Sequence, residues 1–154
     1  MIGMKKVPIS PYQKTLGMCY FPRMLNKIRL FAAGELREDF HDFLGDGLDG
    51  RCCGFLKVSY DEVKEKALGD LSDEAILKWC FEAGRVLDDN DLVIWNHFLT
   101  KLGWRDHATE RVDARKAEGG LEGRDDIISM VEFMEIDEGR ELPQAPDQII
   151  SALV

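Results

Sequence analysis

The stretch DGLDGRCCGFL, which begins at Asp46, carries two adjacent cysteines, Cys52 and Cys53. A nearby cation or a helix N-terminus lowers the pKa of a thiol and makes it nucleophilic. A helix that began near Arg51 and was capped by Asp46 or Asp49 would therefore activate both cysteines. Free cysteine is also among the most buried residue types, and buried structural cysteines are inert. The stretch thus has two interpretations, a reactive thiol loop or a turn that places two cysteines in the core.

His41 lies between Phe40 and Phe43 and is a second candidate for chemistry. An acid/base role would require a substrate group within hydrogen-bonding reach of its ring. We favour the alternative, a half-buried histidine bonded to a backbone carbonyl. The three histidines are far apart in the sequence, and the chain contains no Cys-x-x-Cys pair. The sequence therefore predicts no metal site and identifies no cofactor.

Charge is distributed unevenly along the 154 residues, which have a net charge of −9. The segment that ends at Gly34 has no acidic residue but six basic ones: Lys5, Lys6, Lys14, Arg23, Lys27 and Arg29. The acidic remainder argues against nucleic-acid binding by the whole surface. The basic segment either packs against this acidic remainder, which we favour, or lines a site for an anion.

Helical patterns recur along the chain, while strand patterns are nearly absent. Apolar residues at helical spacing, together with caps such as Ser59 and Ser72, predict the positions of the helices. The main helical segments are 22–36, 59–70, 72–85, 88–104 and 124–140, with shorter or weaker ones at 37–45, 51–56 and 106–120. These segments predict a mainly α-helical single domain over residues 1–154, with about six or seven helices.

Three further expectations concern the C-terminal third. A soft boundary near residues 104–106 would separate an N-terminal bundle from a helical extension. The segment 124–140 is expected to bury Ile127, Ile128, Val131 and Met134 and to expose its acidic side chains: Glu132, Glu135, Asp137 and Glu138. The apolar tail QIISALV should dock on the body of the protein, because it would otherwise expose apolar surface to water.

The sequence also predicts a compartment. No apolar run approaches the ~18 residues that a membrane-spanning helix needs. The first residues lack the apolar centre of a secretory signal. Four cysteines at low density are typical of reduced thiols in the cytoplasm. We therefore predict a cytoplasmic protein without membrane or nucleic-acid partners, and leave its oligomeric state open.

Several motifs carry a family resemblance. A Pro-Arg-Met-Leu-x-Lys-x-Arg element is matched by Pro22, Arg23, Met24, Leu25, Lys27 and Arg29. An Asp-x-Arg element followed by phenylalanine is matched by Asp49, Arg51 and Phe55. Through these and its tryptophan-containing helical segments, from about Ser10 to the early 140s, the chain resembles a bacterial family catalogued only as a domain of unknown function. The resemblance implies one small domain and brings no activity, substrate or cofactor.

The leading functional hypothesis is a binding module for an anionic small molecule or an acidic peptide. Its site would be a groove where a basic helix meets the glycine-rich loop, lined by Arg23, Lys27, Arg29, Asp49 and Arg51. Arginine binds carboxylate or phosphate with two parallel hydrogen bonds, and a helix start adds backbone donors. The arginines could instead pair with the protein's own carboxylates and hold the fold.

Two other classes of function stay open. The first is an enzyme that uses Cys52 or Cys53 as nucleophile, with His41 as acid/base and Arg51 to lower the thiol pKa. The second is an interaction protein that binds a partner through its acidic C-terminal helices. Thiol reactivity at neutral pH distinguishes the enzyme from the binding module.

Overall fold

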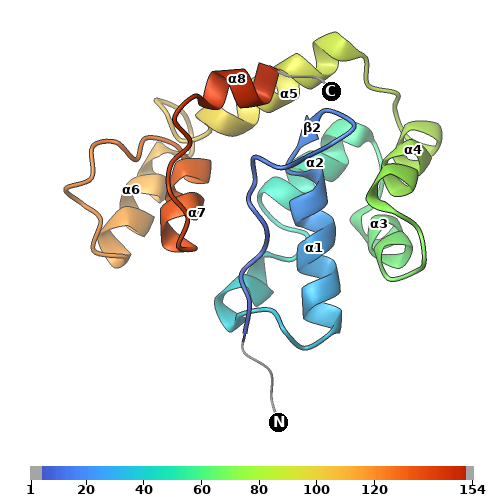
Figure 1. Cartoon of the computed structure of the whole chain (residues 1–154), viewed down its shortest axis with the longest axis horizontal. Helices are drawn as coiled ribbons and strands as arrows, with labels where there is room; N and C mark the ends of the chain where they lie inside the picture. Colours follow the sequence, from blue (N-terminus) through green and yellow to red (C-terminus); the bar gives the residue numbers. More distant parts are fainter. Residues whose placement is uncertain (1–4, 152–154) are drawn as a thin grey trace.

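The computed structural model describes residues 5–151 and confirms a mainly helical protein (Figure 1). A small hairpin comes first, β1 (Lys14–Thr15) and β2 (Met18–Cys19). It is followed by α1 (Phe21–Ala32), the 3-10 helix η1 (Glu38–Phe43), α2 (Leu48–Leu56), α3 (Tyr60–Ala67), α4 (Asp73–Ala83), α5 (Asp89–Lys101), α6 (Thr109–Glu118), α7 (Met130–Asp137) and α8 (Pro146–Ser151). Every segment in which a helix was expected contains one, and the docked tail adds α8.

Side-chain caps set several of the helix starts. Ser59 and Ser72 each accept a hydrogen bond from a backbone N–H in the first turn of α3 and α4, as their spacing predicts. Ser129 and Glu132 form a reciprocal capping box at the start of α7. Because this box begins the helix at Met130, α7 occupies only the second half of the segment 124–140.

Buried Asn96 joins the hairpin, α5 and the C-terminal helix. Its side-chain carbonyl accepts a hydrogen bond from Cys19 N at 3.0 Å, and its amide group donates to the carbonyls of Gly17 and Ile150 at 2.9 and 3.0 Å. These bonds satisfy the buried amide and fix α8 across α5. The expected docking of the tail is thus confirmed as far as Ile150, whereas residues 152–154 lie outside the described part of the chain.

Two apolar clusters lie under the helices. The larger fills the space between the hairpin and α1 to α5 and includes Trp95, while the smaller joins α6 to α7 through Val112, Ile127, Met130 and Phe133. Figure 1 shows α6 and α7 on one side of α1, with α3 and α4 on the other and α5 passing above. Ile128, expected in the core, is half exposed. The soft boundary near 104–106 stays a prediction.

Gly84 allows α4 to end directly against the end of α2. A Cβ atom at this position would clash with the carbonyl of Leu56 and lie 2.6 Å from the carbonyl of Lys57. We therefore expect Gly84→Ala to lower the free energy of unfolding by about 3 kcal/mol, the upper range for overpacking. Gly54→Ala in α2 is the matched control: its Cβ meets nothing within 4 Å, so it should stabilise the helix. Urea unfolding of both variants measures the difference, and equal stabilities would contradict the close approach.

Candidate functional site

A cavity of about 690 Å³ lies between α1, η1 and α2 on one side and α6 and α7 on the other. We call it the interhelical cavity. Its volume is within the range of small-molecule sites in proteins. Three of the five predicted site residues, Arg23, Lys27 and Arg51, line it. The other two, Asp49 and Arg29, do not, and their positions explain how the cavity is built.

Asp49 lies completely buried in the first turn of α2, beneath the cavity. Its carboxylate accepts hydrogen bonds from the Tyr20 hydroxyl at 2.6 Å and the Gly45 N–H at 3.0 Å, and it forms an ion pair with Lys27 Nζ at 2.9 Å. Burial lowers the pKa of Lys27, and the Asp49 charge opposes that effect. Burial and the neighbouring carboxylate both raise the pKa of Tyr20. The cluster thus holds α1 against α2.

Tyr20 has an unusual backbone conformation for its residue type. Its φ is 78°, in the region that favours glycine, and it directly precedes α1. Such a conformation in a buried tyrosine costs free energy and persists only where the surroundings enforce it. The hydrogen bond to Asp49 and the packing around the ring supply that restraint.

Arg23 and Glu138 form the second buried ion pair, which links α1 to the residue that ends α7. The guanidinium and carboxylate make two hydrogen bonds of 2.7 and 2.8 Å, and both side chains are at most 2% exposed. Burial alone would lower the pKa of Arg23, but the bonds and charge of Glu138 outweigh it and raise the pKa. Arg140 also contacts Glu138 and pairs with Glu135 at 2.8 Å. The expectation that Glu135 and Glu138 face outward was therefore wrong, because both pair with arginine.

The remaining predicted cations have different environments. Arg29 points away from the cavity and pairs with Asp73 at 2.5 Å, also donating to the carbonyl of Ala67. Arg51 is exposed, and its guanidinium makes no hydrogen bond or ion pair with any of the described residues. The sequence left open whether the arginines bind a ligand or pair with the protein's own carboxylates. Arg23 has a carboxylate partner. Arg51 has none within the described residues.

Further basic side chains, which the sequence analysis missed, lie around the same cavity. Arg111 and His107 line it without an ion pair in the described part of the chain, and Arg115 lies over the Phe43 ring at 4.7 Å. Two lining acids, Asp46 and Glu118, likewise lack a cationic partner among residues 5–151. Except for Asp46, the residues missed on this side come from α6 and the loop before it, more than 50 residues after α2, so no local spacing could have placed them there.

Apolar side chains form much of the cavity wall: Phe40, Phe43, Leu102, Met130, Phe133 and Met134. The interior also holds one unsatisfied donor, because the buried Nε of Arg23 has no hydrogen-bond partner within the described residues. Leaving a buried donor unpaired costs free energy. An apolar wall with a few directed polar groups is the usual composition of a ligand pocket.

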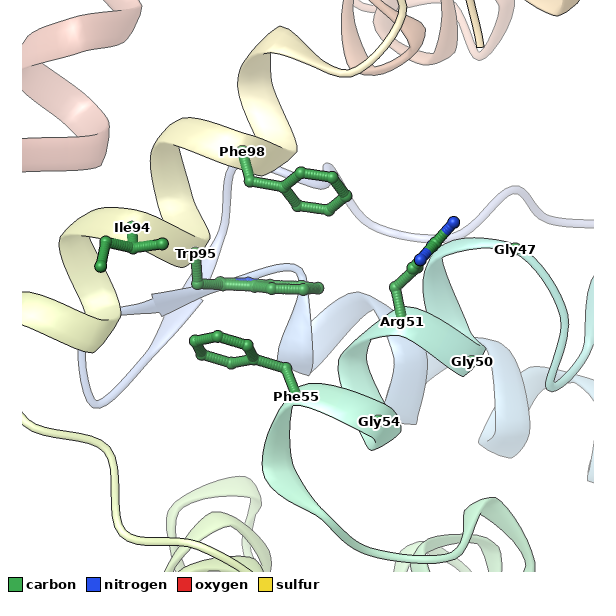
Figure 2. A pocket seen from close by; sticks show the side chains of 8 residues that line it. All are labelled: Gly47, Gly50, Arg51, Gly54, Phe55, Ile94, Trp95 and Phe98. Atoms are coloured by element: carbon green, nitrogen blue, oxygen red, sulfur yellow. The ribbon is translucent and has the colours of Figure 1, made fainter. Parts of the chain in front are cut away.

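A second hollow, which we call the aromatic groove, lies between α2 and α5 and has a volume of about 660 Å³ (Figure 2). It is lined by Gly47, Gly50, Arg51, Gly54, Phe55, Ile94, Trp95 and Phe98. Arg51 lines both the groove and the interhelical cavity. No pattern in the sequence indicated this groove, because its walls come from two helices that are distant in the chain.

The two adjacent cysteines lie in the core. Helix α2 begins at Leu48 after Gly47, with no side-chain cap, so Cys52 and Cys53 lie in its second turn rather than its first. Both thiols are buried. Burial raises the pKa of Cys53 to about 12 and that of Cys52 well above its usual value. A helix start near Arg51 was therefore a wrong expectation, and the environment of both thiols disfavours the thiolate.

Thiol chemistry provides a direct prediction. Cys19 and Cys80 are also buried, and burial raises the pKa of each to about 12. An unfolded thiol ionises near the ordinary value of 9.0, so the raised pKa stabilises the fold fully below pH 9. That stabilisation is lost as the pH rises towards 12, by up to about 1.4 kcal/mol per thiol and pH unit. We expect the melting temperature to fall above pH 9.

The same burial predicts how the thiols react. A disulfide reagent at pH 8 should modify the native protein slowly, whereas all four cysteines should react at once in denaturant. The time course of reagent absorbance measures both rates. A thiol that reacts rapidly in the native protein and is lost in Cys52→Ala or Cys53→Ala would contradict this account and support the enzyme hypothesis.

His41 lies exposed on η1 and lines neither hollow. One ring nitrogen is 3.0 Å from the carbonyl oxygen of Leu36, and the ring meets Phe31 edge-on. The carbonyl contact agrees with the favoured interpretation, although the side chain is more exposed than expected.

Neither a cluster of metal ligands nor a membrane-spanning helix is present within residues 5–151. No three side chains of His, Cys, Asp or Glu cluster there in a way that could hold a metal ion. No helix in that part of the chain combines the length and apolarity needed to cross a membrane.

Comparison with known proteins gives a family but no activity. The family model described as "Domain of unknown function (DUF5069)" matches residues 5–140. The chain therefore belongs to this family, and the match includes α1 to α7, which build both hollows. A search of curated proteins found no match.

Proposed function

We propose that this protein is a binding module for an anionic small molecule, which it holds in the interhelical cavity. One observation carries the proposal: a hollow of about 690 Å³ combines an apolar wall with two exposed arginines, Arg51 and Arg111. Neither arginine has a carboxylate partner among the described residues. Arginines of this kind can give bidentate hydrogen bonds to a phosphate or carboxylate without first breaking an internal ion pair.

Two buried ion pairs hold the walls of the cavity in place before any ligand binds. Lys27 and Arg23 are neutralised by Asp49 and Glu138, so they hold the walls rather than supply free charge. Rigid walls reduce the entropy lost on binding.

The other predicted functions have less support. The two adjacent thiols are buried with raised pKa values, which disfavours a cysteine nucleophile. Two of the acids expected to face a protein partner, Glu135 and Glu138, pair internally. The volume of about 690 Å³ is typical of small-molecule sites and favours a small molecule over an acidic peptide. The cytoplasmic location stays a prediction.

The proposal predicts a ligand-dependent shift in melting temperature. We expect inorganic phosphate, nucleotides or small carboxylic acids to stabilise the protein, by about 2.7 kcal/mol at a hundred times the Kd. Arg51→Ala and Arg111→Ala should each weaken binding about tenfold, because each removes a charge-assisted hydrogen bond. Arg124→Ala is the matched control, since Arg124 pairs with Asp126 away from the cavity. No shift with any of these anions, or equal losses in all three variants, would reject the proposal.

A further inference from the structure

The aromatic groove meets the interhelical cavity at Arg51, which lines both hollows. Arg51 is also the one charged residue that lines the groove in the described structure. In Figure 2 its guanidinium lies beside the open end of the groove, beyond the tip of the Trp95 ring. A ligand whose negative group binds Arg51 could therefore place its uncharged part in the groove.

Three rings form one wall of the groove. Phe55 stacks on Trp95 with a centroid distance of 5.3 Å and an angle of 28°, and Phe98 covers the other face at 5.7 Å. Trp95 is buried in the middle of this stack, whereas Phe55 and Phe98 are half-buried and line the groove. Such rings offer a flat group both apolar contact area and offset or edge-on ring contacts.

The rest of the lining, across from Phe98, is formed mainly by glycines in and just before α2, which have no side chain. Gly50 and Gly54 are four residues apart, which places them on one side of the helix, and Gly47 directly precedes the helix. A Cβ atom at Gly54 would meet nothing within 4 Å, so the space beside this residue is open. A flat group could lie close to the backbone here, and a larger side chain at Gly54 would occupy the same space.

We propose that the anionic ligand carries a flat aromatic group, which lies in the aromatic groove between Phe98 and the glycine face of α2. Arg51 then binds the negative group at the junction of the two hollows. The ligand class is an aromatic anion, such as an aryl phosphate. This inference rests on the proposed function, because it assigns the anion to the interhelical cavity.

Calorimetric titration with inorganic phosphate and phenyl phosphate tests the inference. We expect phenyl phosphate to bind the unmodified protein at least about tenfold more tightly, from the apolar area that the ring buries. Gly54→Leu should remove this gain and leave phosphate binding unchanged. Gly123→Leu is the matched control: a Cβ at Gly123 also meets nothing within 4 Å, and Gly123 lines neither hollow. Circular dichroism should show that both variants melt close to the unmodified protein.

The possible outcomes separate this inference from the proposed function. Equal affinities for the two anions, or a gain that survives Gly54→Leu, would overturn the aromatic ligand and leave the anion site intact. Failure of both anions to bind would overturn the inference and the proposed function together. A gain lost in Gly54→Leu but kept in Gly123→Leu is the result that supports it.

Discussion

Replacing Asp49 with alanine is expected to lower the free energy of unfolding by about 3–5 kcal/mol, the usual effect of removing one partner of a buried ion pair. The substitution leaves Lys27 buried without an opposite charge and removes the acceptor of the Tyr20 hydroxyl. It also removes the carboxylate oxygen that accepts the hydrogen bond of the Gly45 N–H. Urea unfolding followed by circular dichroism measures the loss.

Two variants make this prediction specific. Asp46→Ala removes an exposed carboxylate from the loop just before α2 and should change stability by less than about 0.5 kcal/mol. Combining Asp49→Ala with Lys27→Met should cost clearly less than the two single effects added, because the double variant leaves no buried charge unpaired. Additivity within about 0.5 kcal/mol would show that the 2.9 Å contact between Lys27 and Asp49 carries no coupling.

Glu138→Gln is expected to have an effect of similar size, about 3–5 kcal/mol, since it leaves the Arg23 guanidinium buried and uncompensated. The substitution keeps the shape of the side chain but removes the charge that Arg23 and Arg140 share. Because this pair links α1 to the end of α7, we also expect weaker anion binding in the interhelical cavity.

Asp137→Asn is the control for this second prediction. It alters the neighbouring acid, which is exposed and lies 3.4 Å from Arg37. An exposed pair contributes little, so the change should stay below about 1 kcal/mol. If Glu138→Gln and Asp137→Asn unfolded at the same urea concentration, the ion pair of Arg23 with Glu138 would not be the main connection between α1 and α7.

Local features of the fold were predictable from the sequence, and long-range ones were not. Capping by Ser59 and Ser72 depends on neighbours within three residues, so the sequence was sufficient there. The pairing of Arg23 with Glu138 spans 115 residues, and an acidic residue near the end of a helix is usually solvent-exposed. Helical spacing therefore gave the wrong orientation for Glu138.

The candidate site was predictable in part for the same reason. Arg23 and Lys27 are four residues apart on one helix, which placed them together correctly. Arg29 was assigned to the same groove, but its helical position turns it towards Asp73. Trp95, Phe98 and Arg111 come from α5 and α6, which follow α2 at a distance in the sequence, and only the tertiary fold brings them around the hollows that Arg51 lines.

The most direct test of the account is nuclear magnetic resonance of the arginine side chains during a titration with phosphate. We expect the Nε–H signals of Arg51 and Arg111 to move in a saturable way, while that of Arg124 stays in place. Signals that do not move, or that move equally for all exposed arginines, would contradict an anion site in the interhelical cavity.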